Sequence, residues 1–325
     1  MTRQKILLDG LNTTDRIVEI GPSFNPLAPK RDGWNTFVID HGSRDELIEK
    51  YHDQTVDRIE DVDLVWTGGS LGDAVPGEMH GTFDAFIASH AIEHTTDIIG
   101  FLRAAETLLR PDGIIILAIP DKRKCFDFYR HPSTTGDAIA AFEERRDRHD
   151  VRTHLNYGLL MAIKGDGSSW HEDDTRELRL LNGLNEISGW IASSTSPQYL
   201  DAHNWVFVPA SFRLMILELS LAGYLDLRIE RWQEQRCTEF FVWLRRGAER
   251  VPIEDQPAMR RALMNETLIE IADQTRQIVG SPLHSSWTTK PPAERRAPFS
   301  PPFWSRLVKF DAAKKLSSKL GRQAQ

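Results

Sequence analysis

Short, apolar runs alternate with longer amphipathic stretches through the first 120 residues of the chain. Ser43, with Glu46 three residues later, predicts a capping box for a helix that extends to about Tyr51. A second helix is predicted from about Asp97 to Arg110, where a Pro-Asp-Gly turn ends it. Such alternation predicts an α/β fold with a mostly parallel sheet. Five runs rich in aliphatic and β-branched residues predict its buried strands, at 16–20, 36–39, 63–66, 83–89 and 114–119.

The alternation stops after residue 120 and resumes near residue 209. The segment between, about 121–208, has mixed charge and no clear periodicity, and it is too long for a simple loop. A largely helical insertion or lid after the fifth strand is therefore predicted. An apolar stripe then predicts a helix from Pro209 to Gly223. Two further strands, 224–230 and 238–244, are expected to pair antiparallel at the sheet edge.

The C-terminal part of the chain differs in composition. A helix is predicted over 253–279, with a heptad-like apolar spacing that includes Leu263 and Leu268. Six prolines between residues 281 and 302 predict a linker. From Phe303 onward the chain is basic and amphipathic, which favours peripheral contact with a membrane or a protein. The predicted organisation is a main domain over 1–250 with an insertion at about 121–208, a helical extension over 251–280, and a Pro-rich linker with a basic tail over 281–325.

Composition narrows the classes of function. The chain has 325 residues, a net charge of −7 and a pI of about 5.9, so no nucleic-acid partner is expected. Its two cysteines, Cys125 and Cys237, provide neither a disulfide framework nor the spacing of a zinc site. No apolar run is long enough to predict a membrane span, and the N-terminus lacks the apolar length of a signal peptide. A cytoplasmic enzyme is predicted.

Residues at the ends of the first two predicted strands indicate a nucleotide site. Glu19 and Gly21 close the first strand, and Asp40 closes the second. In open α/β sheets, glycine at this place lets the backbone approach the ligand, and the second acid accepts ribose hydroxyls. The loop after Gly21 begins Pro22-Ser23-Phe24 instead of the Gly-x-Gly-x-x-Gly of dinucleotide sites. A nucleoside without a pyrophosphate therefore fits better, which argues against a nicotinamide-dependent sugar oxidoreductase.

Further motifs follow these along the chain in a fixed order. The ordered set is Glu19-Ile20-Gly21, Asp40, Ser89-His90-Ala91-Ile92-Glu93-His94, Leu109-Arg110-Pro111-Asp112-Gly113 and Ile119-Pro120-Asp121-Lys122-Arg123. This set resembles the class I S-adenosylmethionine-dependent methyltransferases, and within them methyltransferase type 11-like proteins of the kind found in bacterial polysaccharide pathways. The resemblance implies a Rossmann-like, mostly parallel, seven-stranded sheet with a reversed final hairpin. It also implies S-adenosyl-L-methionine at the carboxyl ends of strands one, two and four.

The resemblance assigns candidate roles to individual residues. The implied cofactor-binding residues are Glu19, Gly21, Pro22, Asp40, His41, Gly69, Ser70, Ser89 and His90. The candidate catalytic bases are His94, Asp121 and His203, with Asp127, His154 and His171 as further candidates. No metal is expected, because His154, His171 and the acidic run at 172–174 match no established ligand spacing. Lys122, Arg123 and Lys124 are interpreted either as contacts for a phosphorylated or acidic substrate or as surface charge.

The predicted function is S-adenosyl-L-methionine-dependent O-methylation of a sugar or of a glycan or glycolipid intermediate. The expected partner is a small-molecule or glycan acceptor. A short segment, Ser285–Pro291, resembles a tail motif of glycan-assembly enzymes. The alternative from another class is a catalytically silent protein with the methyltransferase fold that acts as a scaffold in a glycan-assembly complex.

Overall fold

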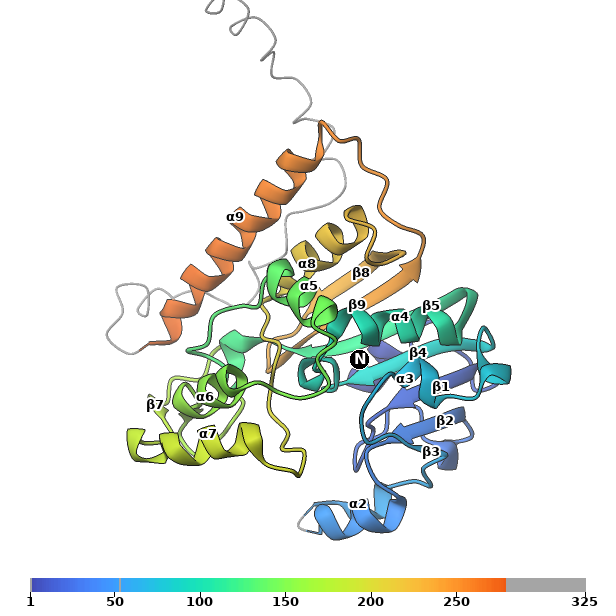
Figure 1. Cartoon of the computed structure of the whole chain (residues 1–325), viewed down its shortest axis with the longest axis horizontal. Helices are drawn as coiled ribbons and strands as arrows, with labels where there is room; N and C mark the ends of the chain where they lie inside the picture. Colours follow the sequence, from blue (N-terminus) through green and yellow to red (C-terminus); the bar gives the residue numbers. More distant parts are fainter. Residues whose placement is uncertain (1, 53, 279–325) are drawn as a thin grey trace, which may run out of the picture. The chain divides into compact units, whose positions relative to one another are not determined.

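The computed structural model of the chain describes residues 2–52 and 54–278 (Figure 1). The chain divides into two units, residues 1–284 and 285–325, and all described residues belong to the first unit. The predicted Pro-rich linker and basic tail at 281–325, with the segment Ser285–Pro291, therefore lie outside the described residues. Contact of this tail with a membrane or a protein stays a prediction.

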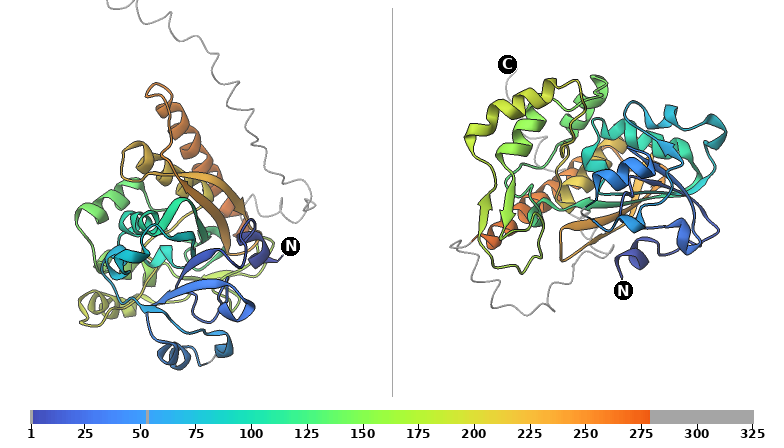
Figure 2. Two further views of the ribbon diagram at one scale, coloured as in Figure 1. Left: turned by 90° about the vertical axis from the view of Figure 1, so that its right-hand side faces the viewer. Right: turned by 90° about the horizontal axis from the view of Figure 1, so that it is seen from below.

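A seven-stranded sheet forms the centre of the described unit, in the order β3-β2-β1-β4-β5-β9-β8 (Figures 1 and 2). Its strands are β1 (Arg16–Ile20), β2 (Asn35–Asp40), β3 (Leu64–Val65), β4 (Phe83–Ser89), β5 (Leu109–Pro120), β8 (Leu227–Glu234) and β9 (Glu239–Arg246). Strands β1 to β5 run parallel, and β9 pairs antiparallel with both β5 and β8. The predicted Rossmann-like sheet with a reversed final hairpin is confirmed.

The helices are α1 (Arg3–Leu7), α2 (Arg44–Lys50), α3 (Leu71–Ala74), α4 (Ile98–Leu108), α5 (Thr135–Glu143), α6 (Val151–Leu159), α7 (Ile187–Thr195), α8 (Pro209–Leu221) and α9 (Gln256–Gln274). Side chains cap the first turns of the helices α1 to α6, whereas α7 and α9 begin without a side-chain cap. The predicted capping box at α2 is present, since Ser43 accepts from the Glu46 N–H and Glu46 accepts from the Ser43 N–H. At α4, Asp97 accepts from the Gly100 N–H at 2.9 Å.

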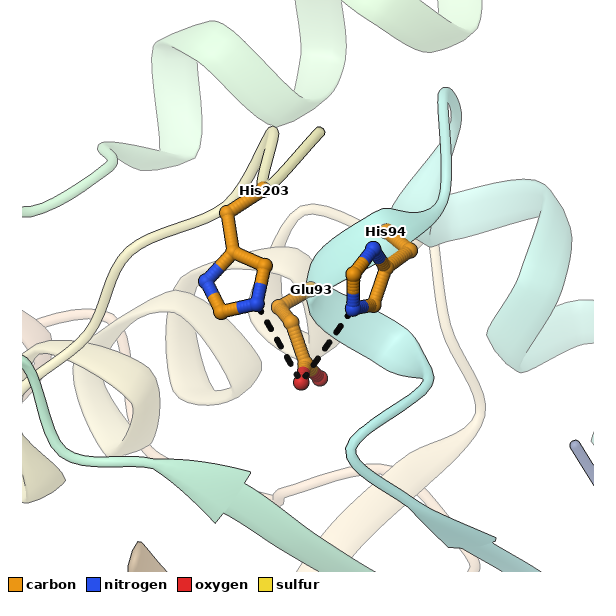
Figure 3. A group of neighbouring side chains, drawn as sticks. All are labelled: Glu93, His94 and His203. Atoms are coloured by element: carbon orange, nitrogen blue, oxygen red, sulfur yellow. Dashed lines mark ion pairs between the residues drawn. The ribbon is translucent and has the colours of Figure 1, made fainter. Parts of the chain in front are cut away.

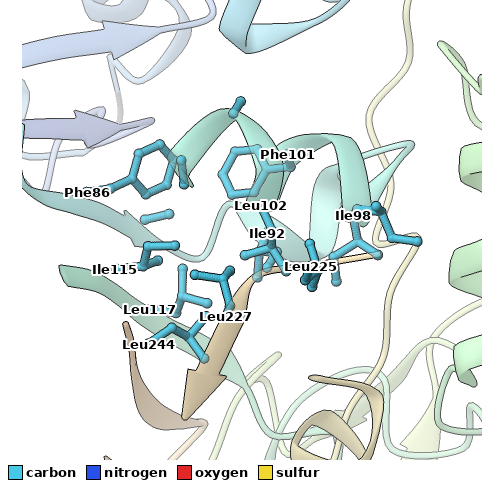
Figure 4. Close-up of a cluster of buried hydrophobic side chains, with 14 of the residues drawn as sticks. Phe86, Ile92, Ile98, Phe101, Leu102, Ile115, Leu117, Leu225, Leu227 and Leu244 are labelled. Atoms are coloured by element: carbon cyan, nitrogen blue, oxygen red, sulfur yellow. The ribbon is translucent and has the colours of Figure 1, made fainter. Parts of the chain in front are cut away.

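The two faces of the sheet are covered differently. On one face the strands pack against α3, α4, α5 and α8, and fully buried Phe86, Ile115 and Leu117 lie against Phe101 and Leu102 of α4 (Figure 4). Each such side chain contributes about 1.5–3 kcal/mol through burial. The other face carries a smaller core that joins the strands to α1 and to the segment after β1. That segment holds only a 3₁₀ turn, Lys30–Asp32, as its prolines predict.

Two boundaries around the sheet differ from the prediction. The Pro-Asp-Gly sequence at 111–113 does not separate α4 from the next strand, because β5 already begins at Leu109. The Pro-Asp-Gly sequence instead lies at a shift in the register of β5 against β4. Leu109 lies opposite Phe83, whereas Ile114 lies opposite Ala85. The strand predicted to begin at residue 224 begins three residues later, at Leu227.

The predicted insertion leaves the sheet after β5 and contains more than helices. Besides α5, α6 and α7 it holds an antiparallel pair of short strands, β6 (Ala162–Lys164) and β7 (Leu178–Leu180), which the sequence did not indicate. Its two ends meet, since Asp121 and Phe207 form a parallel β-bridge and the Lys122 N–H donates to the Phe207 carbonyl at 2.9 Å. Both ends of the insertion are thus attached at the carboxyl end of β5.

The last described helix, α9, lies beside α8 (Figure 1). Of the predicted heptad positions, Leu263 is buried but Leu268 is 65 % exposed, so the apolar spacing does not form one continuous packed stripe. The helix is held instead by polar contacts, such as the ion pair between Arg213 of α8 and Glu266 of α9 at 2.6 Å. None of the helices in the described part of the chain is long and apolar enough to cross a membrane.

Candidate active site

The carboxyl ends of the parallel strands bring Gly21 and Asp40 to one edge of the sheet. Gly21 has a φ of +61°, which glycine adopts without strain, and its N–H donates to the Ile39 carbonyl at 2.8 Å. Asp40 is 2 % exposed, and its carboxylate accepts from the Ser23 N–H at 2.9 Å and from the His41 N–H at 2.8 Å. Nδ1 of His41 lies 2.7 Å from the same carboxylate. Ser23 and His41 thus occupy the carboxylate oxygens of Asp40 in this structure. Hydroxyl groups of a ribose would replace these contacts if they bound to the same oxygens.

The loop after β3 offers open space and an unused donor. Gly68 and Gly69 both have positive φ, and no atom lies within 4 Å of the place where a Cβ would stand. Ser70 serves as the cap of α3, because it accepts from the Asp73 N–H. The indole N–H of Trp66 is buried and, among the described residues, has no hydrogen-bond partner. Trp66 is thus a candidate ligand contact that the sequence analysis missed.

Glu19 lies in β1 two residues before Gly21, and its carboxylate contacts the segment that follows β1. Its carboxylate is 1 % exposed and accepts from the backbone N–H groups of Leu27 at 2.6 Å and Ala28 at 3.1 Å. Burial raises the pKa of Glu19 to about 7, and the two N–H donors offset part of this effect. The side chain fixes the segment after β1, and the geometry gives no support to contact with the ammonium group of the cofactor.

Glu19→Gln is expected to flatten the pH dependence of stability between about pH 5 and pH 7. Because the folded-state pKa of about 7 lies above the ordinary value of 4.5, the native state retains a proton that the unfolded state loses, so stability falls as pH rises through this window. The loss is at most about 3 kcal/mol. Urea denaturation at several pH values measures it. If the free energy of unfolding changed equally with pH in the wild type and in Glu19→Gln, the raised pKa of Glu19 would be contradicted.

Ser89 ends β4 and His90 follows it, and both contact residues at the start of the chain or in β9. Arg3 donates to Ser89 Oγ at 2.6 Å and pairs with Glu239 at 2.7 Å. His90, whose φ is +52°, places Nε2 2.9 Å from Glu239. Although Glu239 is buried, its contacts with Arg3 and His90 lower its pKa to about 2. The sequence analysis identified neither Arg3 nor Glu239.

Three side chains meet next to this group, and they are here called the Glu93 cluster: Glu93, His94 and His203 (Figure 3). Glu93 and His94 lie in the 3₁₀ turn after β4, whereas His203 comes from the end of the insertion. Nε2 of each histidine lies 3.8 Å from the same oxygen, Oε1 of Glu93. Glu93 is 1 % exposed, and within the described part of the chain neither of its carboxylate oxygens has a hydrogen-bond partner.

Each histidine of the cluster has a carboxylate on its other ring nitrogen. Nδ1 of His203 lies 2.5 Å from Asp127, which also pairs with Arg130 at 2.8 Å. Nδ1 of His94 lies 2.9 Å from Asp201. Burial opposes a charge on His94, but Asp201 and Glu93 outweigh it and raise the pKa of this imidazole. The structure thus brings together His94, His203 and Asp127, three of the predicted base candidates, with Glu93, which the sequence analysis gave no role.

The remaining base candidates lie apart from the cluster. Asp121 is fully buried and pairs with Arg123 at 2.5 Å and Lys124 at 3.2 Å. These cations outweigh its burial and hold its pKa well below the ordinary value, which leaves a weak base. His154 is buried against His149, and burial lowers the pKa of its ring. His171 is exposed in the acidic loop.

Lys122, Arg123 and Lys124 are neither substrate contacts nor surface charges, which corrects both interpretations of this basic run. All three are buried, at 3 %, 6 % and 2 % exposure. Lys122 Nζ donates to the Phe128 carbonyl at 2.8 Å and to Gln274 at 2.5 Å, so it joins the insertion to α9. The run is a structural centre that connects β5, the final hairpin and α9.

A surface cavity of about 500 Å³ lies elsewhere, between α4 and the start of β8. Arg103, Glu106, Gly223 and Tyr224 line it. Because β8 starts beside the first residues of β5, this cavity is at the amino edge of the sheet, opposite Asp40 and the Glu93 cluster. It contains none of the predicted site residues.

Comparison with known proteins identifies part of the chain. Residues 49–117 match the family model of a methyltransferase domain, and this segment contains β3, β4, α4, Glu93 and His94. A search of curated proteins found no significant match to the chain. Similar solved structures include the CcbJ methyltransferase from Streptomyces caelestis (13% identity, TM-score 0.39, covering 75% of this chain and 88% of that one). An S-adenosylmethionine-dependent methyltransferase from Mesorhizobium loti is also similar, with 14% identity and a TM-score of 0.39. That match covers 75% of this chain and 98% of the other.

Another similar structure is a Rhodobacter sphaeroides protein whose description proposes a Zn-dependent alcohol dehydrogenase (14% identity, TM-score 0.41, 75% of this chain and 89% of that one). At such TM-scores these similarities carry no argument about activity. The strand order shows a Rossmann-like sheet, and residues 49–117 are similar to a methyltransferase domain. This similarity supports S-adenosyl-L-methionine as the cofactor.

Proposed function

We propose that the chain O-methylates a hydroxyl group of a sugar or of a sugar-containing glycan or lipid intermediate, in the cytoplasm. The observation that carries this proposal is the Glu93 cluster, which lies at the same edge of the sheet as Asp40 and Gly21. A hydroxyl is a poor nucleophile until its proton is removed, so an O-methyltransferase benefits from basic groups beside the reacting oxygen.

The carboxyl edge has a distinct part for each portion of the cofactor. Asp40 would accept the ribose hydroxyls once Ser23 and His41 release it, and the backbone at Gly21 would lie along the methionine portion. Trp66 and Gly69 would contact the adenine, which the unpartnered indole N–H of Trp66 and the open space at Gly69 support. When bound, the cofactor supplies an electrophilic methyl group on a sulfonium.

The remaining chemistry falls to the acceptor and to the Glu93 cluster. The cofactor would supply the methyl group and its sulfur would keep the bonding electron pair, so the chain itself would have to orient the acceptor hydroxyl and take its proton. The hydroxyl proton is lost at the cluster and passes to solvent. His94 and His203 are the imidazoles of the cluster that would accept the proton. Asp121 instead pairs with Arg123, which favours a structural role for Asp121.

Aromatic rings from the insertion support a ring-shaped acceptor. Phe126 lies 4.5 Å from His203 between ring centroids, and Tyr157 of α6 lies 5.7 Å from Phe126. Tyr199 is 46 % exposed and contacts His149 beside Asp201. Such rings provide a flat apolar wall for the C–H face of a sugar, and the hydroxyls remain free for polar contacts. The glycan class itself rests on the sequence resemblance.

Methyl transfer to a panel of sugars, nucleotide sugars and lipid-linked sugars tests the proposal. We expect release of S-adenosylhomocysteine only with a hydroxylated acceptor, and a product heavier by one methylene group. Acceptors that lack one hydroxyl at a time identify the methylated position. Binding of S-adenosylhomocysteine without turnover on any acceptor would favour the scaffold, and methylation of an amine would refute O-transfer.

A further inference from the structure

Glu93 presents an electrostatic problem that the methyltransferase fold does not require. Its carboxylate is buried, and neither oxygen has a hydrogen-bond partner among the described residues. A buried carboxylate without a hydrogen bond is costly, and native proteins usually pair such a group or use it to coordinate a metal. Imidazole nitrogens of His90, His94 and His203 each lie 3.8 Å from Oε1, within reach of an ion pair but too far for a hydrogen bond.

The two histidines are oriented so that Nε2 faces this carboxylate. Asp201 lies on Nδ1 of His94 at 2.9 Å, and Asp127 lies on Nδ1 of His203 at 2.5 Å. A carboxylate hydrogen-bonded to one ring nitrogen fixes the proton there and leaves the lone pair on the other nitrogen, as Asp127 does for His203. Asp201 lies near Nδ1 of His94 without a hydrogen bond to it. Nε2 of each histidine is the atom nearer Oε1 of Glu93, an arrangement that a cation between these atoms would stabilise. Carboxylate–histidine pairs of this kind are a recurring feature of metal sites.

We propose that Glu93, His94 and His203 bind a divalent transition-metal ion, with Asp201 and Asp127 as the outer partners of the two histidines. The ligand atoms of the three residues all lie within 4.8 Å of one another. Two atoms that each lie about 2.1 Å from one ion can be up to about 4.2 Å apart, so the 3.8 Å separations to Glu93 already permit binding. This proposal replaces the expectation from sequence that no metal is bound.

The donor set selects the kind of ion. Two imidazole nitrogens and one carboxylate oxygen suit zinc, iron, cobalt or manganese better than magnesium or calcium, which prefer oxygen ligands. His90 is the nearest further donor, since its Nδ1 also lies 3.8 Å from Oε1 of Glu93. Three protein ligands leave positions open for other molecules, as in catalytic sites. If the proposed function holds, an acceptor hydroxyl at an open position would lose its proton more readily.

Metal binding can be measured without cofactor or acceptor. Tag-free protein is stripped with a chelator, and ZnCl₂, MnCl₂ and CoCl₂ are titrated by calorimetry, with the visible absorption of Co²⁺ as a second readout. We expect one ion per chain. We expect Glu93→Gln and His94→Asn to weaken binding about 100-fold or more. We expect Asp127→Asn, which removes the carboxylate that orients His203 and pairs with Arg130, to weaken it about 10- to 100-fold.

The control is His171→Asn, which removes an exposed histidine beside the acidic residues Glu172 and Asp173 and leaves the Glu93 cluster intact. We expect it to bind the ion like the wild type. Thermal denaturation of each variant separates loss of ligands from loss of folding, and His94→Asn serves if Glu93→Gln does not fold. Absence of binding, or loss of binding in His171→Asn alone, would overturn the proposal. Calorimetry with S-adenosylhomocysteine distinguishes such a failure from failure of the cofactor site.

Discussion

Asp40→Ala is expected to weaken binding of S-adenosylhomocysteine by about 10- to 100-fold. The buried carboxylate ends β2, and its oxygens accept from loop groups that ribose hydroxyls can replace. Hydrogen bonds to a charged group contribute about 1.5–3 kcal/mol, and each 1.4 kcal/mol changes affinity about tenfold. Isothermal titration calorimetry of the wild type and the variant gives the ratio directly.

A matched control is available on the neighbouring helix. Asp45→Ala removes the same charge from the first turn of α2, where the side chain is exposed. We expect its affinity to stay within about twofold of the wild type, because exposed charges are strongly screened. Equal affinities for wild type and Asp40→Ala, in a protein that melts normally, would show that the ribose is held elsewhere.

Asp121→Ala is expected to lower the free energy of unfolding by about 3–5 kcal/mol, since it leaves two buried cations with only the half-exposed carboxylate of Glu234. Arg123 and Lys124 are 6 % and 2 % exposed and lie at 2.5 and 3.2 Å from this carboxylate. Chemical denaturation measures the loss. Glu234→Ala is the control, because Glu234 contacts the same cations with a side chain that is 41 % exposed, so we expect a cost of about 1 kcal/mol or less.

The same pair of variants decides between two roles of Asp121. A structural role predicts that Asp121→Ala, studied at a temperature where it is folded, binds S-adenosylhomocysteine like the wild type. Normal stability combined with loss of methyl transfer would instead restore Asp121 as a general base.

Most of the sheet could be predicted because its strands are short, aliphatic and buried on both faces. The predicted limits of β4 agree with the structure, and the Ser43 capping box correctly located α2. The start of β5 was wrong because Pro111 and Gly113, which usually end a helix, here lie in an irregular stretch within the strand. The strands β6 and β7 were missed because three residues are too few to show an alternation.

The candidate site was predictable only where its residues follow strands. Gly21 comes directly after β1 and Asp40 ends β2, and topology alone places them at one edge. Glu93 was overlooked because an acid beside a histidine suggests solvent exposure, and only the folded chain shows that it is buried and faces His203. For the same reason the basic run at 122–124 was interpreted as a substrate contact or as surface charge, although Arg123 and Lys124 pair with Asp121 and Glu234 inside the fold.

The bridge between Asp121 and Phe207 has an evolutionary consequence. Because the insertion departs and returns at neighbouring positions, its length and sequence can diverge, or be exchanged by recombination, without shifting the strands that carry Asp40 and Gly21. Relatives with an identical cofactor cradle could thereby acquire different acceptors. Only the few inserted residues that reach back to Glu93, His203 above all, would be constrained during such divergence.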